Sequence, residues 1–285
     1  MDFDAKMQEY IDAIDRDLEE FIQPDCPEIL LEAVKYSLFT GGKRIRPVIL
    51  LAVCDMFGGK RNDALPFACA LEMIHTYSLI HDDLPALDND DQRRGKPTNH
   101  KVYGEGMALL AGDALLNLAY EVMSNFCYTN NKPHFLRAMV KMSLSAGMGG
   151  MIGGQVMDVR LEGAPATAAD VGYIYKNKTA KLFEAAFDCG AWAAGWDFGA
   201  AYDMFLIGRA VGMAFQLQDD FLDLEADQKI GKPTFAAVLG IEAAKKLHDK
   251  YSTEALDGLK LLKSRDGFDS DFLVALVQSL IHRTR

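Results

Sequence analysis

The sequence is poor in cysteine, and its cysteines suit neither a disulfide framework nor a zinc site. The 285 residues include five cysteines, an odd number, and none forms a Cys-x-x-Cys pair. We therefore expect buried free thiols in a reducing compartment and a cytoplasmic location. The cysteines are Cys26, Cys54, Cys69, Cys127 and Cys189.

Long apolar runs and an excess of basic residues are also missing. No segment approaches the roughly 18 consecutive apolar residues of a membrane span, so stable membrane insertion is not expected. The first six residues, MDFDAK, lack the basic and apolar regions of a signal peptide. The formal net charge of −11 argues against nucleic acid as a partner. A chain of this charge that binds an anion must gather its cations locally.

The hydrophobic pattern has the helical period almost throughout, and no alternating strand pattern is convincing. Glycine and proline breaks fall at 58–59, 130–133, 163–165 and 231–233. The simplest prediction is one all-α domain, a helical bundle over residues 1–285. Helices are expected at residues 28–40, 47–57, 63–84, 106–127, 133–149, 169–196, 200–224 and 241–248.

The first of two aspartate motifs covers residues 80–95, IHDDLPALDNDDQRRG. Pro85 lies between its carboxylates, so the helix should kink or end there and let Asp88 curl back toward Asp82. The alternative is a solvated helix end, although acidic residues at a helix C-terminus oppose the macrodipole. Its charged residues of interest are Asp82, Asp83, Asp88, Arg93 and Arg94.

The second motif covers residues 215–223, FQLQDDFLD, and supplies Asp219, Asp220 and Asp223. Asp219 and Asp223 are four residues apart, so they share a helix face and repel each other. Hard oxygen ligands on two helices suit Mg²⁺, which usually completes its octahedron with water and substrate phosphates. The two motifs together predict a diphosphate held between metal bridges.

Cations and histidines lie near these motifs. Residues 41–47, GGKRIRP, place three cations behind a glycine turn, a plausible diphosphate clamp or simply an exposed basic turn. His75 lies two helical turns before Asp82, where it is either a ligand or a core histidine with a satisfied hydrogen bond. His81 adjoins the first aspartates of the motif at 80–95, where it would act only indirectly.

Two polar groups follow a run of small residues at 144–154. The run is a poor helix by propensity and would suit a close approach of two backbones. Gln155 and Asp158 share one helix face behind it, and Asn177-Lys178-Thr179 lies inside a helical segment. No set of nucleophile, base and orienting residue stands out, so a covalent mechanism is not suggested.

Six motifs in this order resemble the short-chain trans-isoprenyl diphosphate synthases, the family that includes the bacterial farnesyl diphosphate synthases. The resemblance covers the chain from about Glu28 onward, and it implies an all-α bundle of the isoprenoid synthase type around a central cavity, usually as a homodimer. The motifs are GGKRIRP, LIHDDLPALDNDDQRRGKPT, LAGDAL, GGQVMD, NKT and FQLQDDFLD.

The resemblance also implies roles for individual residues. Three Mg²⁺ ions, replaceable by Mn²⁺, would be held through Asp82, Asp83 or Asp88 and through Asp219, with Asp220 and Asp223 in support. The allylic diphosphate would contact Arg93, Lys178, Gln216 and Lys232. The diphosphate of isopentenyl diphosphate would contact Gly42, Lys43, Arg46, His75 and Arg94. Thr179 and Gln216 would face the reacting carbons, so catalytic roles are expected for Lys178, Thr179 and Gln216.

The implied reaction is ionisation of the allylic C–O bond, attack by the double bond of isopentenyl diphosphate, and loss of a proton to the released diphosphate. Tyr77 and Ser78 lie five and four residues before Asp82, where a tyrosine ring would limit chain growth. They predict the C15 product, farnesyl diphosphate, with C10 geranyl and C20 geranylgeranyl diphosphate as alternatives. Tyr77 could instead merely pack against a neighbouring helix.

Other functions fit the residues less well. A terpene cyclase would usually lack the clamp of Lys43, Arg46 and His75. A non-catalytic partner subunit would commonly lose one aspartate cluster, and a metal-dependent hydrolase would need a water-activating base that we do not find. One departure from the family pattern is that Pro233 runs straight into Thr234. A longer polar loop with a further lysine is usual there, which suggests that a mobile loop is missing.

Overall fold

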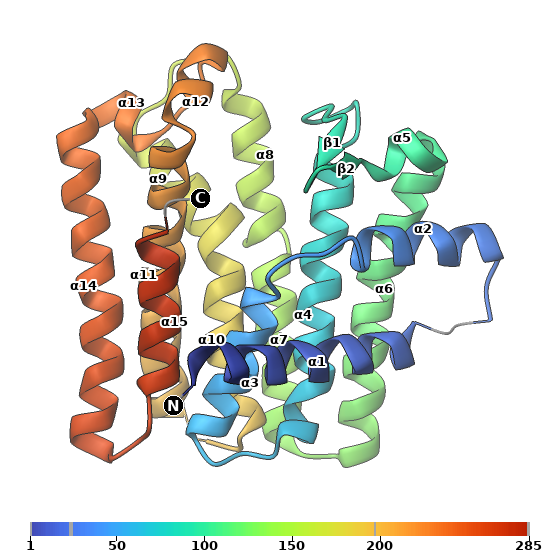
Figure 1. Cartoon of the computed structure of the whole chain (residues 1–285), viewed down its shortest axis with the longest axis vertical. Coiled ribbons are helices and arrows are strands. Elements are labelled where there is room, and N and C mark those ends of the chain that lie inside the picture. The colour runs from blue at the N-terminus through green and yellow to red at the C-terminus, as the bar shows by residue number, and fades with distance from the viewer. Residues whose placement is uncertain (1, 23–24, 197, 284–285) are drawn as a thin grey trace.

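The computed structural model describes residues 2–22, 25–196 and 198–283. It confirms an all-α fold of the isoprenoid synthase type (Figure 1). The elements are α1 (Phe3–Phe21), α2 (Glu28–Leu38), α3 (Ile45–Met56), α4 (Arg61–Asp82), β1 (Gln92–Arg93), β2 (Lys96–Pro97), α5 (Asn99–Tyr103), α6 (Glu105–Asn130), α7 (Pro133–Ala146), α8 (Met151–Leu161), α9 (Ala168–Ile174), η1 (Tyr175–Ala180), α10 (Lys181–Ala193), α11 (Phe198–Leu222), α12 (Leu224–Ile230), α13 (Phe235–Leu239), α14 (Ile241–Asp266) and α15 (Asp271–Ile281).

The centre of the bundle is formed by α4 and α10. Both helices bury side chains on all their faces, as expected of helices without a polar stripe. The helix α4 packs against α1, α3, α6 and α10, among others, while α10 also packs against α3, α7 and α11. Figure 1 shows that α4 and α11 lead to the same end of the bundle, where β1 and α12 follow them. The fold therefore brings the ends of the two aspartate-bearing helices to one end of the molecule.

The helix α6 is the one described helix that is long and apolar enough to cross a membrane by length and composition alone. Ala111, Leu115 and Ala119 are buried along it, and the helix packs lengthwise against α4. Leu109 and Leu110 are exposed on another side. The apolar residues of α6 thus pack against the neighbouring helix α4 inside the bundle.

The pair of strands β1 and β2 corrects the expectation of a chain without strands. Gln92 pairs with Pro97 and Arg93 with Lys96. The two turn residues, Arg94 and Gly95, have φ of 54° and 75°, as a two-residue type I′ turn requires. Strands of two residues are too short to show alternation, so the pattern could not reveal them.

The segment predicted as one helix at 169–196 is divided in three. The helix α9 widens into the π-helical η1 before α10 begins, and Asn177, Lys178 and Thr179 all lie in η1. Such wide turns occur rarely and are frequent at functional sites. The helices α1, α5, α8, α12, α13 and α15 were not among those expected, although α8 carries the predicted face of Gln155 and Asp158. The helix expected at 241–248 continues to Asp266 as α14.

The run of small residues at 144–154 permits a close approach of two backbones, as predicted. A Cβ on Gly154 would lie 2.1 Å from the backbone N of Lys178. No larger residue fits there, because a backbone atom cannot move aside as a flexible side chain can. Gly154 therefore lets α8 lie directly against η1.

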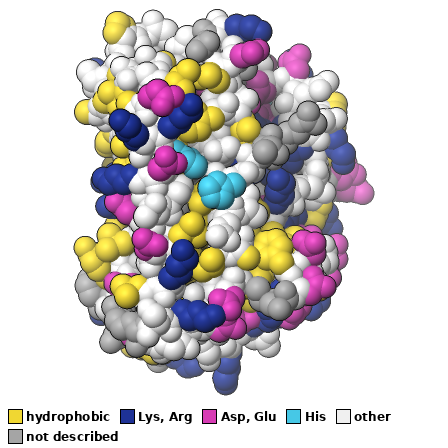
Figure 2. All heavy atoms as spheres, turned by 60° about the vertical axis from the view of Figure 1, so that its left-hand side comes forward, with side chains coloured by type: hydrophobic (Ala, Val, Ile, Leu, Met, Phe, Trp, Pro, Cys, Tyr) yellow, Lys and Arg dark blue, Asp and Glu magenta, His cyan; other side chains and the backbone are white. Residues whose placement is uncertain are grey.

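Three of the cysteines, Cys54, Cys69 and Cys189, are buried free thiols, as expected, while Cys26 and Cys127 are only partly buried. On the face shown in Figure 2, Lys and Arg side chains alternate with Asp and Glu side chains. The net negative charge therefore does not form a single acidic patch on that face.

The connection between α12 and α13 is short. Gly231 ends α12 in the left-handed conformation with φ of 69°, and the N–H of Lys232 donates to the carbonyl of Asp227 at 3.0 Å. Thr234 then caps α13 by accepting a hydrogen bond from the N–H of Ala237 at 3.1 Å. The missing loop at Pro233 and Thr234 stays a prediction.

Candidate active site

A cavity of about 460 Å³ lies between α4, α8, η1 and α10. It brings together predicted site residues from four separate parts of the sequence. Those in its lining are Arg46, His75, Tyr77, Ser78, Asp82, Lys178 and Thr179, and Gln155 lines it as well. Apolar side chains from α8, including Ile152 and Val156, form another wall. The cavity thus combines a charged end with an apolar channel.

The first aspartate motif folds as predicted. The helix α4 ends at Asp82, residues 84–87 form turns, and the N–H of Asp88 donates to the carbonyl of Asp82 at 2.9 Å. Burial and the nearby Asp82 raise the pKa of Asp88 to about 6. Carboxylates gathered in this way need a cation to offset their repulsion.

Lys178 supplies part of that positive charge. Its Nζ lies 2.7 Å from a carboxylate oxygen of Asp158 and 3.5 Å from one of Asp82. Burial alone would lower the pKa of Lys178, but the two carboxylates together raise it above its usual value. Lys178 is therefore a fixed cation beside the first motif.

Asp83 differs from its neighbours because it is already paired. Its side chain is buried and accepts hydrogen bonds from Nε of Arg93 at 2.7 and 3.0 Å, with the second guanidinium nitrogen, Nη2, at 2.6 Å. The β1–β2 hairpin holds Arg93 in this position. Arg93 was predicted to contact a diphosphate, and in this structure its guanidinium forms an ion pair with Asp83.

The second aspartate motif has three distinct environments. Asp219 forms an ion pair with Arg283, whereas Asp223 is exposed at the N-cap of α12. Asp220 is buried and accepts hydrogen bonds from the hydroxyl of Tyr175 and from Nε2 of Gln216. Burial raises the pKa of Asp220 to about 8. Asp220 is a buried anchor, and its neighbours face outward.

Asp158 on α8 links the two motifs electrostatically. Burial is the largest cause of the raised pKa of Asp82, Asp88 and Asp220. The negative charge of Asp158 adds to the rise at Asp82 and Asp88 in the first motif and at Asp220 in the second. Thr179 Oγ1 donates to Gln216 Oε1 at 2.6 Å, which ties η1 to α11. The two motifs thus face each other across α8 and η1.

The donor set of the two motifs fits Mg²⁺. All the candidate ligands are carboxylate oxygens, the hard donors that Mg²⁺ prefers. Among the described residues, no three His, Cys, Asp or Glu side chains converge on one point closely enough to hold a metal ion. Mg²⁺ is usually bound through one or two carboxylates and completed by water and phosphate oxygens.

A second polar group surrounds Arg46 and His75. The Arg46 guanidinium carbon lies 4.5 Å from the ring centroid of Phe183, and burial lowers the pKa of Arg46 to about 10. Its Nε is buried without a hydrogen-bond partner among the described residues. Burial, and then the positive charges of Arg46 and Arg94, lower the pKa of His75. A neutral histidine and an unsatisfied cation form a site that suits an anion.

The glycine turn at 41–47 positions Arg94 against this group. Arg94 donates to the carbonyl of Gly41, and a Cβ on Gly42 would lie 2.6 Å from an Arg94 nitrogen. Lys43 is exposed on the same turn. The third cation of the turn, Arg44, is buried in ion pairs with Glu72 at 2.8 Å and Asp15 at 2.9 Å. Only Lys43 and Arg46 of the three cations remain for a ligand.

Of the remaining predicted residues, Tyr77 and Ser78 line the cavity of about 460 Å³, whereas Lys232 lines a different one beside α12. Lys232 pairs with Asp227 at 3.3 Å, and its charge opposes the rise in the pKa of Asp219. Tyr77 is 5% exposed, and its hydroxyl has no partner among the described residues. Ser78 Oγ donates to the carbonyl of His75 at 2.8 Å. The Tyr77 ring thus forms part of the channel wall.

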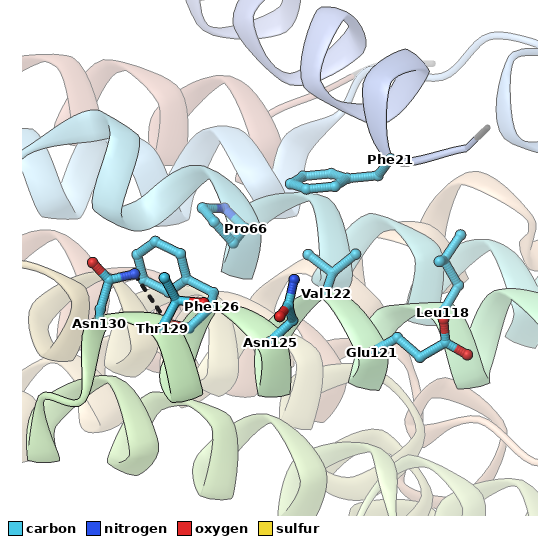
Figure 3. A pocket seen from close by; sticks show the side chains of 9 residues that line it. All are labelled: Phe21, Pro66, Leu118, Glu121, Val122, Asn125, Phe126, Thr129 and Asn130. Carbon is cyan, nitrogen blue, oxygen red and sulfur yellow. Dashed lines mark hydrogen bonds between the residues drawn. The ribbon is translucent and has the colours of Figure 1, made fainter. Parts of the chain in front are cut away.

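A different cavity of about 440 Å³ lies at the other end of α4, between α1, α4 and α6 (Figure 3). Phe21, Pro66 and Val122 line it together with the amides of Asn125 and Asn130. Glu121 is the one charged side chain in its described lining. The described lining of this second cavity therefore has neither the cluster of aspartates nor the cations that define the candidate active site.

The motifs did not identify two residues that the structure places in the site. Arg283 follows α15, and Tyr175 begins η1. Each contacts an aspartate at least 45 residues away in the chain, so no local pattern could reveal it. Asp158 was noticed in the sequence, and its central position comes from the packing of α8 against η1.

The fold and the site define a prenyltransferase of the all-α class, and comparisons with known proteins agree. The sequence profile of the polyprenyl synthetase family matches residues 27–238. The farnesyl diphosphate synthase of Geobacillus stearothermophilus is 42% identical over 84% of this chain and 85% of that protein. A chloroplastic geranylgeranyl pyrophosphate synthase of Capsicum annuum is 38% identical over 95% of this chain and 76% of that protein.

The solved structures agree as well. An FPP/GFPP synthase from Zymomonas mobilis superposes with a TM-score of 0.88 at 34% identity and covers 98% of both chains. The chain belongs to the polyprenyl synthetase family. It is a trans-prenyltransferase of the farnesyl/geranylgeranyl diphosphate synthase type.

Proposed function

We propose that the chain condenses dimethylallyl or geranyl diphosphate with isopentenyl diphosphate and releases farnesyl diphosphate as its main product. The observation that carries the proposal is the cavity of about 460 Å³, whose lining joins Asp82 and Lys178 to an apolar channel beside Tyr77. A charged end suits a diphosphate, and an apolar channel suits a growing hydrocarbon chain.

The allylic diphosphate lies at the charged end in this proposal. Lys178 and Lys232 supply positive charge, and Mg²⁺, when bound, offsets the charge that develops on the departing diphosphate. Asp82, Asp88, Asp219 and Asp223 are the outward carboxylates that would hold three ions. Asp83 and Asp220 support them from positions where both side chains are almost fully buried.

Isopentenyl diphosphate binds at the second polar group. Arg46, Arg94 and Lys43 offset its charge, and neutral His75 donates or accepts a hydrogen bond. Thr179 and Gln216, joined by a hydrogen bond at 2.6 Å, lie between the two groups and face the reacting carbons. The leaving diphosphate takes the proton, which agrees with the lack of a protein base in the sequence motifs.

A geranylgeranyl product is the second candidate, favoured by the plant relatives of nearly equal identity. The buried ring of Tyr77 argues for the shorter product, since it narrows the channel one turn before Asp82. We also propose a cytoplasmic homodimer. The exposed apolar side chains Leu109 and Leu110 on α6 and Leu136 and Leu144 on α7 supply a surface for a second copy.

One experiment tests the proposal. The purified protein is incubated with dimethylallyl and isopentenyl diphosphates in Mg²⁺, in Mn²⁺ and in excess chelator, and the products are separated by chromatography. We expect mainly the C15 product with either metal and none with chelator. Mainly C20 product would favour the second candidate, and full activity in chelator would exclude the metal role.

A further inference from the structure

The segment after α15 places an arginine on the second aspartate motif. Arg283 forms an ion pair with Asp219, and its side chain is 15% exposed. The backbone carbonyl of Arg283 accepts a hydrogen bond from Nε2 of Gln218 at 2.7 Å. The guanidinium carbon lies 3.8 Å from the ring centroid of Phe215, a favourable cation–π contact. Three residues of α11 thus hold Arg283 in the site.

Arg46 makes a second cation–π contact with the same Phe215 ring. The guanidinium carbon of Arg46 lies 6.0 Å from the ring centroid. Two cations on one ring repel each other, and this repulsion adds to burial in lowering the pKa of Arg46. Both side chains have a buried Nε without a hydrogen-bond partner among the described residues. The pair therefore has donors to spare for an anion larger than one carboxylate.

Asp219 is also the outward carboxylate to which the proposed function assigns a metal ion. A carboxylate that binds a divalent cation cannot keep a full ion pair with a guanidinium at the same oxygens, because the two cations repel each other. Binding of the metal at Asp219 therefore competes with Arg283. The stack on Phe215 would keep a displaced guanidinium beside Arg46.

We propose that Arg283 is a substrate-binding residue that exchanges partners. It pairs with Asp219 until a divalent cation binds that carboxylate, and its guanidinium then turns to the diphosphate of isopentenyl diphosphate beside Arg46. This inference rests on the proposed function, in which Asp219 is a metal ligand.

The exchange predicts effects of opposite sign on two ligands. Removing the guanidinium removes a competitor of the metal, so the metal alone binds more tightly. It also removes a cation near the diphosphate, so the diphosphate binds more weakly when metal is present. A residue that merely maintained the fold would weaken both ligands.

The test measures binding to the full chain without turnover. Mn²⁺ alone is titrated by electron paramagnetic resonance, and isopentenyl diphosphate, which does not turn over without an allylic partner, is titrated by calorimetry at saturating Mn²⁺. We expect Arg283→Ala to bind Mn²⁺ roughly three to ten times more tightly, since it loses one partly exposed ion pair. We expect it to bind isopentenyl diphosphate about ten times more weakly. Arg283→Lys should recover most of the diphosphate affinity.

Lys263→Ala is the matched control. It removes one positive charge that pairs with Asp271 at 2.6 Å on the surface of α14, so it should change neither affinity. Arg283→Gln keeps a long hydrogen-bonding side chain and tests the charge if the alanine variant folds poorly, as judged by circular dichroism.

The variant Asp219→Asn distinguishes a failure of the proposed metal role of Asp219 from a failure of the partner exchange of Arg283. If this substitution leaves Mn²⁺ binding unchanged, the metal role of Asp219 in the proposed function fails. If Asp219→Asn weakens Mn²⁺ binding but Arg283→Ala leaves the Mn²⁺ affinity unchanged or weaker, the exchange is overturned while the proposed function stands.

Discussion

The two aspartate motifs are alike in sequence but are held by different kinds of partner. The middle aspartate is buried in both, with Asp83 3% and Asp220 2% exposed. A cation, Arg93, holds Asp83, whereas neutral donors on Tyr175 and Gln216 hold Asp220.

Neutral donors offset less of the cost of burying a charge than a cation does. Burial accordingly raises the pKa of Asp220 to about 8, while Arg93 opposes the rise at Asp83. The middle aspartate of each motif thus fixes its helix to a neighbour, and it is the outer aspartates to which the proposed function assigns the ligand.

The largest effect is expected for the outer carboxylates. Asp82→Ala and Asp219→Ala should each lower turnover by about a thousandfold or more, because each removes charge that would hold a metal beside the diphosphate. Steady-state rates in Mg²⁺ and circular dichroism measure activity and folding. Asp257→Ala, on the exposed surface of α14, serves as a control and should leave both unchanged. Near-normal turnover of either variant would show that the motifs are not equivalent.

The next largest effect distinguishes the cation proposed to bind isopentenyl diphosphate, Arg46, from the one proposed to bind the allylic diphosphate, Lys178. Arg46→Ala should raise the Michaelis constant for isopentenyl diphosphate far more than that for the allylic substrate, and Lys178→Ala should do the reverse. Each lost charge-assisted contact is worth roughly 1.5 to 3 kcal/mol, which is about ten- to a hundredfold. Steady-state kinetics with each substrate varied in turn decide the matter. Equal effects of both variants on both substrates would refute the assignment.

A smaller effect on stability tests the comparison directly. Asp83→Asn should lower the free energy of unfolding by about 2 kcal/mol, because it removes the closer counter-charge of the partly buried Arg93 and leaves only Asp90 at 3.7 Å. Asp220→Asn should lower it by less than about 1 kcal/mol, since the amide oxygen still accepts the hydrogen bond from Tyr175. Urea unfolding without metal measures both. Similar losses would mean that the two middle aspartates are held in the same way.

The smallest effect concerns the product and leaves the diphosphate groups untouched. Tyr77→Ala should shift the main product from C15 toward C20, because the buried ring narrows the channel one turn before the first motif. Tyr77→Phe is the control and should keep the C15 product, since the Tyr77 hydroxyl has no hydrogen-bond partner among the described residues. Chromatography of the products measures both variants. An unchanged chain length in Tyr77→Ala would mean that Tyr77 only packs.

The sequence by itself indicated most of the longer helices and the place of the aspartates at the ends of two of them. Both depend on near neighbours in the chain, because an apolar period or a Pro85 after Asp82 acts within a few residues. The end of α4 at Asp82 and the return of Asp88 were therefore predictable. The family resemblance then followed from the order of the motifs.

Only the tertiary structure decided which carboxylate of each motif is buried and what holds it. Asp220 meets Tyr175 across 45 residues, and Asp219 meets Arg283 from beyond α15. Asp158 lies between the motifs only because Gly154 lets α8 touch η1. Such contacts depend on how distant helices pack and on the low dielectric of the interior, which strengthens every charge placed there. The periodicity of apolar residues along the chain contains no information about how distant helices pack or about the dielectric around a buried charge.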